Sequence, residues 1–193
     1  MAILRVASLG DTPPGLLPKP IHSSAVPLYL TSPAGNILVT TAAPVNTLFA
    51  VPFPCPEDMV ILELAVRVNA GGGAGSVARC GIYQATSPTN IYPRTLIIET
   101  GELDTSASGL KKTTISQQLY RGTLYWLAYL AGVAAPSVYG GDTALHVIGH
   151  LSDMTGVTYV TKAQAYGAMP ALFPASGSWT NGAVPQPLLR RAA

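Results

Sequence analysis

The sequence predicts an all-β protein: an antiparallel, jelly-roll-like β-sandwich with an extended, proline-rich N-terminal arm. Short apolar stretches recur along the chain and are separated by turn residues such as glycine, serine, asparagine and proline. No window carries a sustained helical period with caps at both ends, although residues 163–171 could hold one short helical turn. Many short strands without helices between them are typical of sandwiches and barrels, and we expect a sandwich.

The arm is predicted from its proline content. Residues 1–56 hold ten of the seventeen prolines, and because proline fixes φ and removes a backbone donor, this region should form neither a helix nor a central strand. It is nevertheless apolar and poor in charge, unlike a disordered tail. We expect an extended arm over residues 1–56, with its first short strands at about 36–53. A sandwich domain with an extended C-terminal tail should follow over residues 57–193.

The run at residues 122–132 is the richest in apolar and aromatic side chains, and we expect it to be the central strand. With a period of two, both of its faces are apolar, so both should be covered. The uncharged run ends at Pro136 and is shorter than the roughly 20 apolar residues that a bilayer requires, so no membrane span is expected. The two faces should hold Leu124, Trp126, Ala128 and Leu130, and Tyr125, Leu127, Tyr129 and Ala131.

Alternation of apolar and polar residues over 59–69 predicts a half-buried strand. Its apolar face should hold Val60, Leu62, Leu64, Val66 and Val68. A loop is expected over residues 86–94 because of its prolines and asparagine. Further strands are expected at residues 36–42, 46–51, 77–84, 96–103, 110–115, 143–151 and 157–161.

The surface should be poor in charge. Charged residues are 10% of the chain, against about 25% in an average soluble domain, and the mean hydropathy is +0.34. This composition favours an obligate assembly. The net charge is +2 and the basic residues are scattered, so no nucleic-acid partner is expected.

The first ten residues lack the long apolar core of a secretory signal, which favours a protein made in a cytoplasm.

Metal ligands and reactive thiols are not indicated. Cys55 and Cys80 have no second cysteine or histidine at metal-ligand spacing, and we expect both thiols to be reduced. His146 and His150 would share one face of a helix, but their neighbours favour a strand, where positions four apart are separated by about 13 Å. We expect no metal or cofactor, although a histidine pair across a symmetry axis stays open.

Catalytic residues are also not indicated. Glu99, Glu102 and Asp104 form the densest acidic cluster, but a glycosidase needs two carboxyls that flank its sugar, usually from separate elements. The glycine-rich run at 71–75 has no helix behind it of the kind that a phosphate loop needs. No Gly-x-Ser-x-Gly elbow occurs either. We expect no enzymatic activity.

Two sets of residues are candidate contact sites. Tyr92 and Trp179 are expected in loops, where an exposed ring could stack on a sugar. An apolar, proline-stiffened arm suits docking because little conformational entropy is lost when it binds. The arm candidates are Leu16, Leu17, Ile21, Val26, Leu28, Tyr29 and Leu30.

Five segments carry a resemblance to known proteins. They are 79–83 (Arg-Cys-Gly-Ile-Tyr), 92–96 (Tyr-Pro-Arg-Thr-Leu), 122–128 (Gly-Thr-Leu-Tyr-Trp-Leu-Ala), 167–174 (Gly-Ala-Met-Pro-Ala-Leu-Phe-Pro) and 184–190 (Val-Pro-Gln-Pro-Leu-Leu-Arg). Through these strand and turn patterns, residues 60–189 resemble a β-sandwich module of tailed-bacteriophage virion proteins. The resemblance implies a virion component with a jelly-roll-like fold. Such modules serve as capsid cement or decoration proteins, as head fibres, and in tail fibres or receptor-binding proteins.

Among these roles we expect a capsid cement or decoration protein that is made in the host cytoplasm. We expect it to bind the major capsid protein on the virion surface as a homotrimer. The chain has no heptad run and no repeat of the kind that builds a fibre stalk. The alternative is a tail or head fibre protein that recognises a host glycan through Tyr92 and Trp179. A third hypothesis, a secreted carbohydrate-active enzyme that uses Glu102 or Asp104, is disfavoured because no signal sequence is seen.

Overall fold

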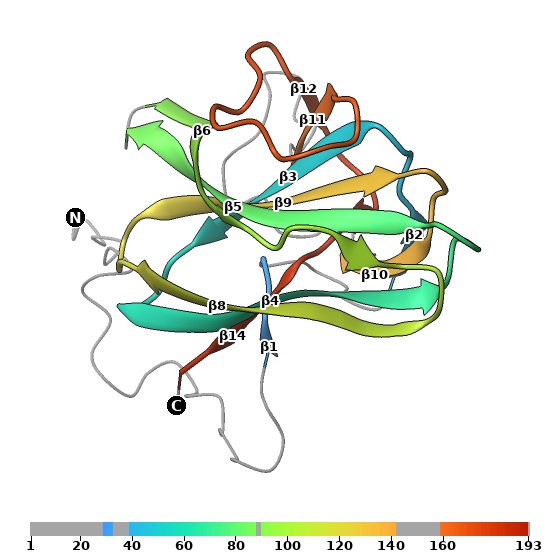
Figure 1. Ribbon diagram of the computed structural model, residues 1–193. Coiled ribbons are helices and arrows are strands. Elements are labelled where there is room, and N and C mark those ends of the chain that lie inside the picture. Colours follow the sequence, from blue (N-terminus) through green and yellow to red (C-terminus); the bar gives the residue numbers. More distant parts are fainter. Residues whose placement is uncertain (1–28, 33–38, 88–89, 142–158, 193) are drawn as a thin grey trace, which may run out of the picture.

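The computed structural model describes residues 29–32, 39–87, 90–141 and 159–192. These residues form fourteen strands and no helix, arranged as two antiparallel sheets that pack face to face (Figure 1). The predicted all-β sandwich is therefore confirmed. Residues 1–28, which make up most of the expected arm, lie outside the described part of the chain, as does the strand expected at 143–151.

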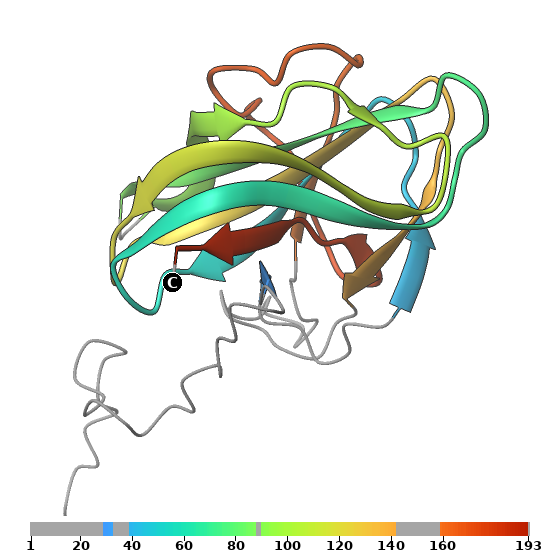
Figure 2. The same cartoon turned by 60° about the horizontal axis from the view of Figure 1, so that its bottom comes forward.

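The first sheet runs in the order β1, β14, β4, β10, β13, with β8 paired to β4 and β2 paired to β10. Figure 2 shows this sheet from its outer side, with β8, β4 and β14 next to one another. Its strands are β1 (Tyr29–Leu30), β2 (Val39–Ala42), β4 (Met59–Ala70), β8 (Gly109–Leu119), β10 (Ser137–Gly141), β13 (Val184–Pro185) and β14 (Leu188–Arg191).

The second sheet runs in the order β12, β11, β3, β9, β5, β6, with β7 paired to β5. Along the strands that the structure describes, the chain changes sheets eight times: between β2 and β3, β3 and β4, β4 and β5, β7 and β8, β8 and β9, β9 and β10, β10 and β11, and β12 and β13. Such connectivity is typical of Greek-key and jelly-roll sandwiches. Its strands are β3 (Thr47–Pro54), β5 (Val77–Ser87), β6 (Asn90–Glu99), β7 (Leu103–Asp104), β9 (Leu124–Gly132), β11 (Tyr159–Ala163) and β12 (Ser178–Thr180).

The central strand of the second sheet is β9, as the sequence predicts. It pairs with β3 on one side and β5 on the other, and every residue after Leu124 is buried. The two predicted faces are also confirmed, because Tyr125, Leu127 and Tyr129 lie in the core between the sheets while Trp126 lies in a second apolar layer.

The strand β3 corrects the expectation that no central strand occurs before residue 57. It lies between β11 and β9, but β11 pairs with Thr47–Ala50 only, whereas β9 pairs as far as Pro54. Pro52 therefore lies beyond the end of β11, where its missing N–H removes no hydrogen bond from that neighbour. Because β3 and β2 belong to the two sheets, the sandwich includes residues before position 57.

The strand β4 departs from its predicted alternation. Its register shifts by one residue between Ile61 and Glu63 relative to β8, and a shift at the same level occurs relative to β14. A β-bulge of this kind moves the following side chains to the opposite face. As a result Ile61 and Leu64 both face the core, while Val60 and Leu62, which were expected there, are only half-buried.

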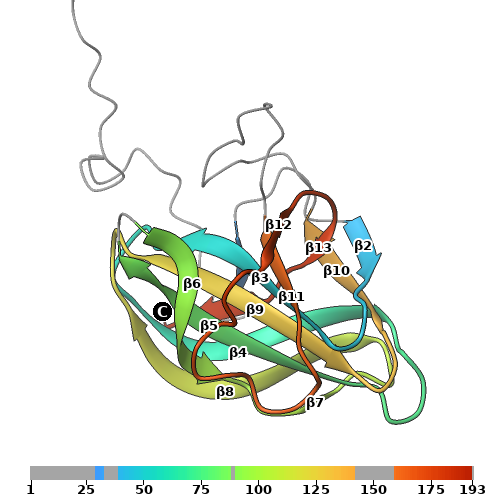
Figure 3. The same cartoon turned by 90° about the horizontal axis from the view of Figure 1, so that it is seen from above.

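A second apolar layer covers the outer face of the second sheet. The segment 164–177 between β11 and β12, which we call the strap, crosses this face over β9 and β5 (Figure 3). Its Met169 and Phe173 are buried against Tyr83, Trp126 and other outward-facing residues of the sheet. The strap contains no helix, so the short helical turn considered for residues 163–171 does not form.

The turn after β9 holds a strained residue. Val133 has a φ of +62° and is 74% exposed, and a β-branched side chain rarely adopts this left-handed conformation. We expect Val133→Gly to raise the free energy of unfolding by about 1 kcal/mol, because the strain is relieved and little contact is lost. Chemical denaturation would measure this, and Val133→Ala, which keeps Cβ, should gain less. An unchanged midpoint for the glycine variant would contradict the assignment of strain.

Candidate functional site

The outer face of the first sheet carries a row of polar side chains across four neighbouring strands. Tyr29 in β1 pairs with Arg190 in β14, Arg190 pairs with Glu63 in β4, and Lys112 lies on β8 beyond it. The Tyr29 hydroxyl and the Lys112 ammonium donate hydrogen bonds to the Glu63 carboxylate, the latter over 2.9 Å, and the Arg190 guanidinium donates another over 2.6 Å. Glu63 is thus the centre of a network that joins all four strands.

The network fixes the charge of its central carboxylate. Burial by itself would raise the pKa of Glu63, but the hydrogen bonds from Tyr29, Lys112 and Arg190 outweigh it and lower the pKa to about 2. Burial and the bond to Glu63 raise the pKa of Tyr29 to about 12. Near neutral pH the network therefore holds one carboxylate, two cations and a neutral phenol, and its net charge is positive.

A small hollow of about 120 Å³ opens beside this network and shares Tyr29 with it. It exists because β4 pairs with β14 as far as Ala65 and with β10 from Val68, which leaves Arg67 opposite the gap between the two partner strands. The residues that line it are Tyr29, Thr31, Arg67, Tyr139, Gly140, Gln186 and Leu188.

Backbone packing fixes the shape of the hollow. At Gly140 the chain passes so close to β13 that a Cβ atom would lie 2.1 Å from the carbonyl oxygen of Val184. Gln186 follows β13 and is only 6% exposed. The Thr31 hydroxyl lies 2.7 Å from Gln186 Oε1 and 3.0 Å from the carbonyl oxygen of Pro187. The hollow is therefore lined by four separate segments, and the three that contain Thr31, Gly140 and Gln186 hold one another in place.

Two of the seven predicted arm contacts lie within the described residues, and both pack against the domain itself. Tyr29 belongs to the Glu63 network, and Leu30 packs against the core between the sheets. Together they attach the chain to the sandwich at the point where residues 1–28 join it. The other five arm residues, Leu16, Leu17, Ile21, Val26 and Leu28, lie outside the described part.

The two aromatic candidates are brought together, but they lie in strands and not in loops as expected. Tyr92 in β6 and Trp179 in β12 have ring centroids 5.9 Å apart in an edge-to-face arrangement. The Tyr92 hydroxyl donates to the carbonyl oxygen of Pro174 and accepts from the N–H of Gly177, so it holds the strap. Trp179 packs on Trp126 and is 37% exposed, which leaves part of its ring in contact with solvent.

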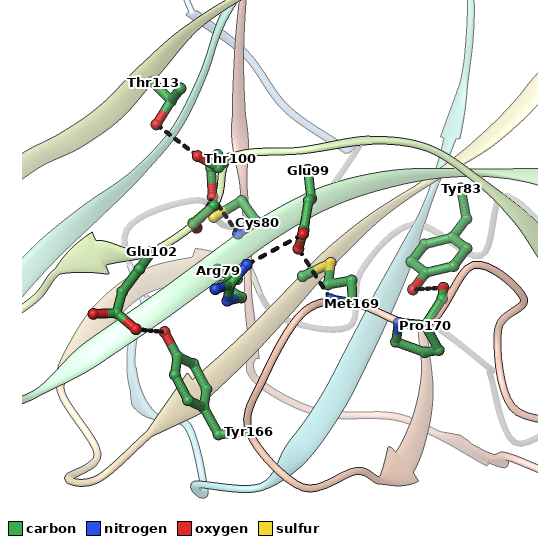
Figure 4. Close-up of polar contacts among 11 residues, drawn as sticks. Arg79, Cys80, Tyr83, Glu99, Thr100, Glu102, Thr113, Tyr166, Met169 and Pro170 are labelled. Atoms are coloured by element: carbon green, nitrogen blue, oxygen red, sulfur yellow. Dashed lines mark hydrogen bonds and ion pairs between the residues drawn. The ribbon is translucent and has the colours of Figure 1, made fainter.

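The acidic cluster also holds the strap (Figure 4). Glu99 pairs with Arg79 at 3.1 Å and accepts the backbone N–H of Met169, while Glu102 accepts the hydroxyl of Tyr166. Asp104 accepts the N–H of Ser106 in a turn, and the side-chain and backbone hydrogen bonds of Ser106 lower its pKa. A glycosidase acid needs a raised pKa, and Asp104 shifts in the opposite direction.

The cysteines are free thiols, as expected, and both are buried. Burial raises the pKa of Cys55 to about 11 and raises that of Cys80 as well, so neither is a thiolate near neutral pH. His146 and His150 lie outside the described residues. Among the residues that are described, no group of three or more histidine, cysteine or acidic side chains could hold a metal ion. They also form no helix long and apolar enough to cross a membrane.

No protein-family model matches the chain, and no curated protein matches its sequence.

Proposed function

We propose that this chain is a non-catalytic structural protein of a bacteriophage virion, and that it acts as a capsid cement or decoration protein. The observation that carries the proposal is the attachment of the N-terminal segment: residues 1–28 lead into β1, an edge strand of the first sheet, and the Tyr29 hydroxyl of β1 belongs to the positively charged Glu63 network. An N-terminal segment that enters the domain beside a polar face suits a protein that lies over a shell.

Composition and side-chain contacts support this proposal. A chain with 10% charged residues suits a protein whose surface lies against neighbours, here the major capsid protein and other copies of itself in a homotrimer. The acidic residues that an enzyme could use are held in contacts to the strap and to a turn. No cofactor is required for such a role.

The mechanism of a cement protein is thermodynamic linkage. A protein that binds the assembled shell, but not the free subunits, stabilises the shell in proportion to its affinity and concentration. A trimer would bind the shell with a higher overall affinity than a single copy, because its second and third arms bind at a high effective concentration.

The proposal predicts that deletion of residues 1–28 abolishes decoration of the head while the domain stays folded. Tyr29 and Leu30 are kept in this variant because they belong to the sandwich. Heads that lack the protein would be incubated with full-length or truncated protein, and bound copies would be counted by electron microscopy and gel densitometry. A thermal melt of the truncated protein is the folding control. Full occupancy by the truncated protein would contradict the role of the arm.

The alternative, a fibre or receptor-binding protein, is favoured by one feature, the partly exposed Trp179 over Tyr92. The same particles distinguish the two roles. Many copies spread over the head agree with a cement protein, whereas a few copies at the tail or at fibre tips would assign the function to host recognition.

A further inference from the structure

We propose that the hollow beside the Glu63 network is a socket for one acidic side chain, a glutamate or aspartate, on the surface of the protein to which this domain docks. The inference deepens the proposed function and rests on it for the identity of the partner, the shell. It concerns the hollow lined by Arg67, Tyr139 and Gln186.

The first argument is the unused cation at the hollow. Among the other basic residues of this sheet, Lys112 and Arg190 pair with Glu63 and Arg191 pairs with Glu57. Lys111 in β8 forms no ion pair with a described residue, but it does not line the hollow. Arg67 is exposed and forms no ion pair or hydrogen bond with any described residue. Its guanidinium can therefore bind a carboxylate through two parallel hydrogen bonds without breaking an existing contact.

The second argument is the kind of hydrogen-bonding group that lines the hollow. Gln186 is 94% buried, and its Oε1 lies beside the Thr31 hydroxyl. Within the described chain its Nε2 has no hydrogen-bond partner, and the hydroxyl of Tyr139 has none either. An arginine, an amide NH₂ and a phenol all donate, and an ionised carboxylate is the side-chain group that only accepts.

The third argument is charge. Among the described residues, the outer face of this sheet holds the cations Arg67, Lys112 and Arg190 and the carboxylate of Glu63, which stays ionised near neutral pH because its pKa is about 2. This excess of positive charge stands out on a chain with so few charged residues. It would attract an acidic partner and repel a basic one.

The fourth argument is size. Pockets for small molecules usually enclose roughly 300–1,000 Å³, and the hollow has about 120 Å³. That volume accommodates the end of one side chain more readily than a whole sugar. The socket lies next to β1, where residues 1–28 join the domain, so the arm and the socket would reach the same partner.

The test uses the purified full-length protein and a hexaglutamate peptide as the probe. In a titration followed by NMR of isotope-labelled protein at low salt, we expect saturable shifts at Arg67, Tyr139 and Gln186. Arg67→Ala should weaken binding about tenfold. Arg94→Ala is the matched control, because Arg94 is an exposed arginine on the other sheet, and its binding should be unchanged. Hexaglutamine should not bind. Equal binding by the Arg67 and Arg94 variants, or shifts spread over the surface, would overturn the proposal.

Two further experiments distinguish a failure of the socket proposal from a failure of the proposed cement function. If free glucuronate binds as tightly as the peptide, the site takes small carboxylates and the docking proposal is wrong. If the peptide binds as expected but the wild-type protein does not decorate heads, the socket proposal is supported and the proposed cement function is wrong. If heads are decorated, Arg67→Ala should reduce occupancy more than Arg94→Ala, and equal occupancy would exclude the socket from that contact.

Discussion

Replacing Glu63 with alanine is expected to lower the free energy of unfolding by about 3 kcal/mol. The carboxylate is 5% exposed and accepts hydrogen bonds from Tyr29, Lys112 and Arg190, which lie on three different strands. Its removal leaves two cations next to each other and releases the contact that holds β1. Breaking a buried ion pair costs several kcal/mol, and the partial exposure of the two cations places the expected loss toward the lower end. Urea denaturation at pH 7 would measure it.

Glu57→Ala is the matched control for this prediction. Glu57 also pairs with an arginine of β14, Arg191, but its side chain is 49% exposed. Exposed pairs contribute roughly 0–1 kcal/mol, so the control should differ little from the wild type. Equal losses for the two variants would show that the Glu63 network does not hold the strands together.

The same carboxylate predicts how stability depends on pH. The folded protein lowers the pKa of Glu63 from 4.5 to about 2, so its contribution is fully present above about pH 4.5 and is lost as the pH falls toward 2. Glu63→Gln cannot titrate at this position. The difference in stability between wild type and Glu63→Gln should therefore shrink between pH 5 and pH 2, whereas a constant difference would contradict the lowered pKa.

Replacing Phe173 with alanine is expected to cost about 3 kcal/mol, because a buried aromatic ring is lost and a cavity remains. Phe173 is 2% exposed and packs edge-to-face on Tyr83 and Tyr92, with centroids at 5.3 and 5.8 Å. The loss should be local as well as global. Amide hydrogen exchange should accelerate in the strap and at Leu96, whose N–H bonds to the carbonyl oxygen of Ala171.

The neighbouring residue provides the control. Leu172 is also apolar and also in the strap, but it is 52% exposed. Leu172→Ala should change stability by less than about 0.5 kcal/mol. If both variants behave alike, the strap does not form a second apolar layer with the sheet.

Sequence periodicity correctly predicted a strand where each of its two faces keeps the same polarity along the whole strand. In β9 both faces are apolar over many residues, so period-two reading located the strand and both apolar layers. In β4 the same reading correctly placed Leu64, Val66 and Val68 in the core. It failed for Val60 and Leu62, because a bulge near Leu62 reverses the alternation and nothing in a single sequence marks that position. The strap was also missed, since its buried Met169 and Phe173 stand among glycines, prolines and alanines in a segment without a sustained period.

The candidate site could not be predicted for a different reason. Glu63 occupies a polar position of an alternating strand, which normally indicates a solvent-facing side chain. Its burial depends on Tyr29, Lys112 and Arg190, which are 34, 49 and 127 residues away in the sequence. The aromatic pair Tyr92 and Trp179 was selected for exposure, but exposure of Tyr92 is limited by the strap, whose course over the sheet only the fold reveals.

The strap also makes the two broad sides of the molecule unequal. Apolar residues of the strap cover the outer face of the second sheet, whereas the described residues form no corresponding apolar layer over the first sheet. The two broad faces of the domain therefore differ, and copies that attach through the first sheet would all expose the strap on the opposite face. Differences between related chains in the strap would then change what the outside of such a layer displays, while the mode of attachment stays the same.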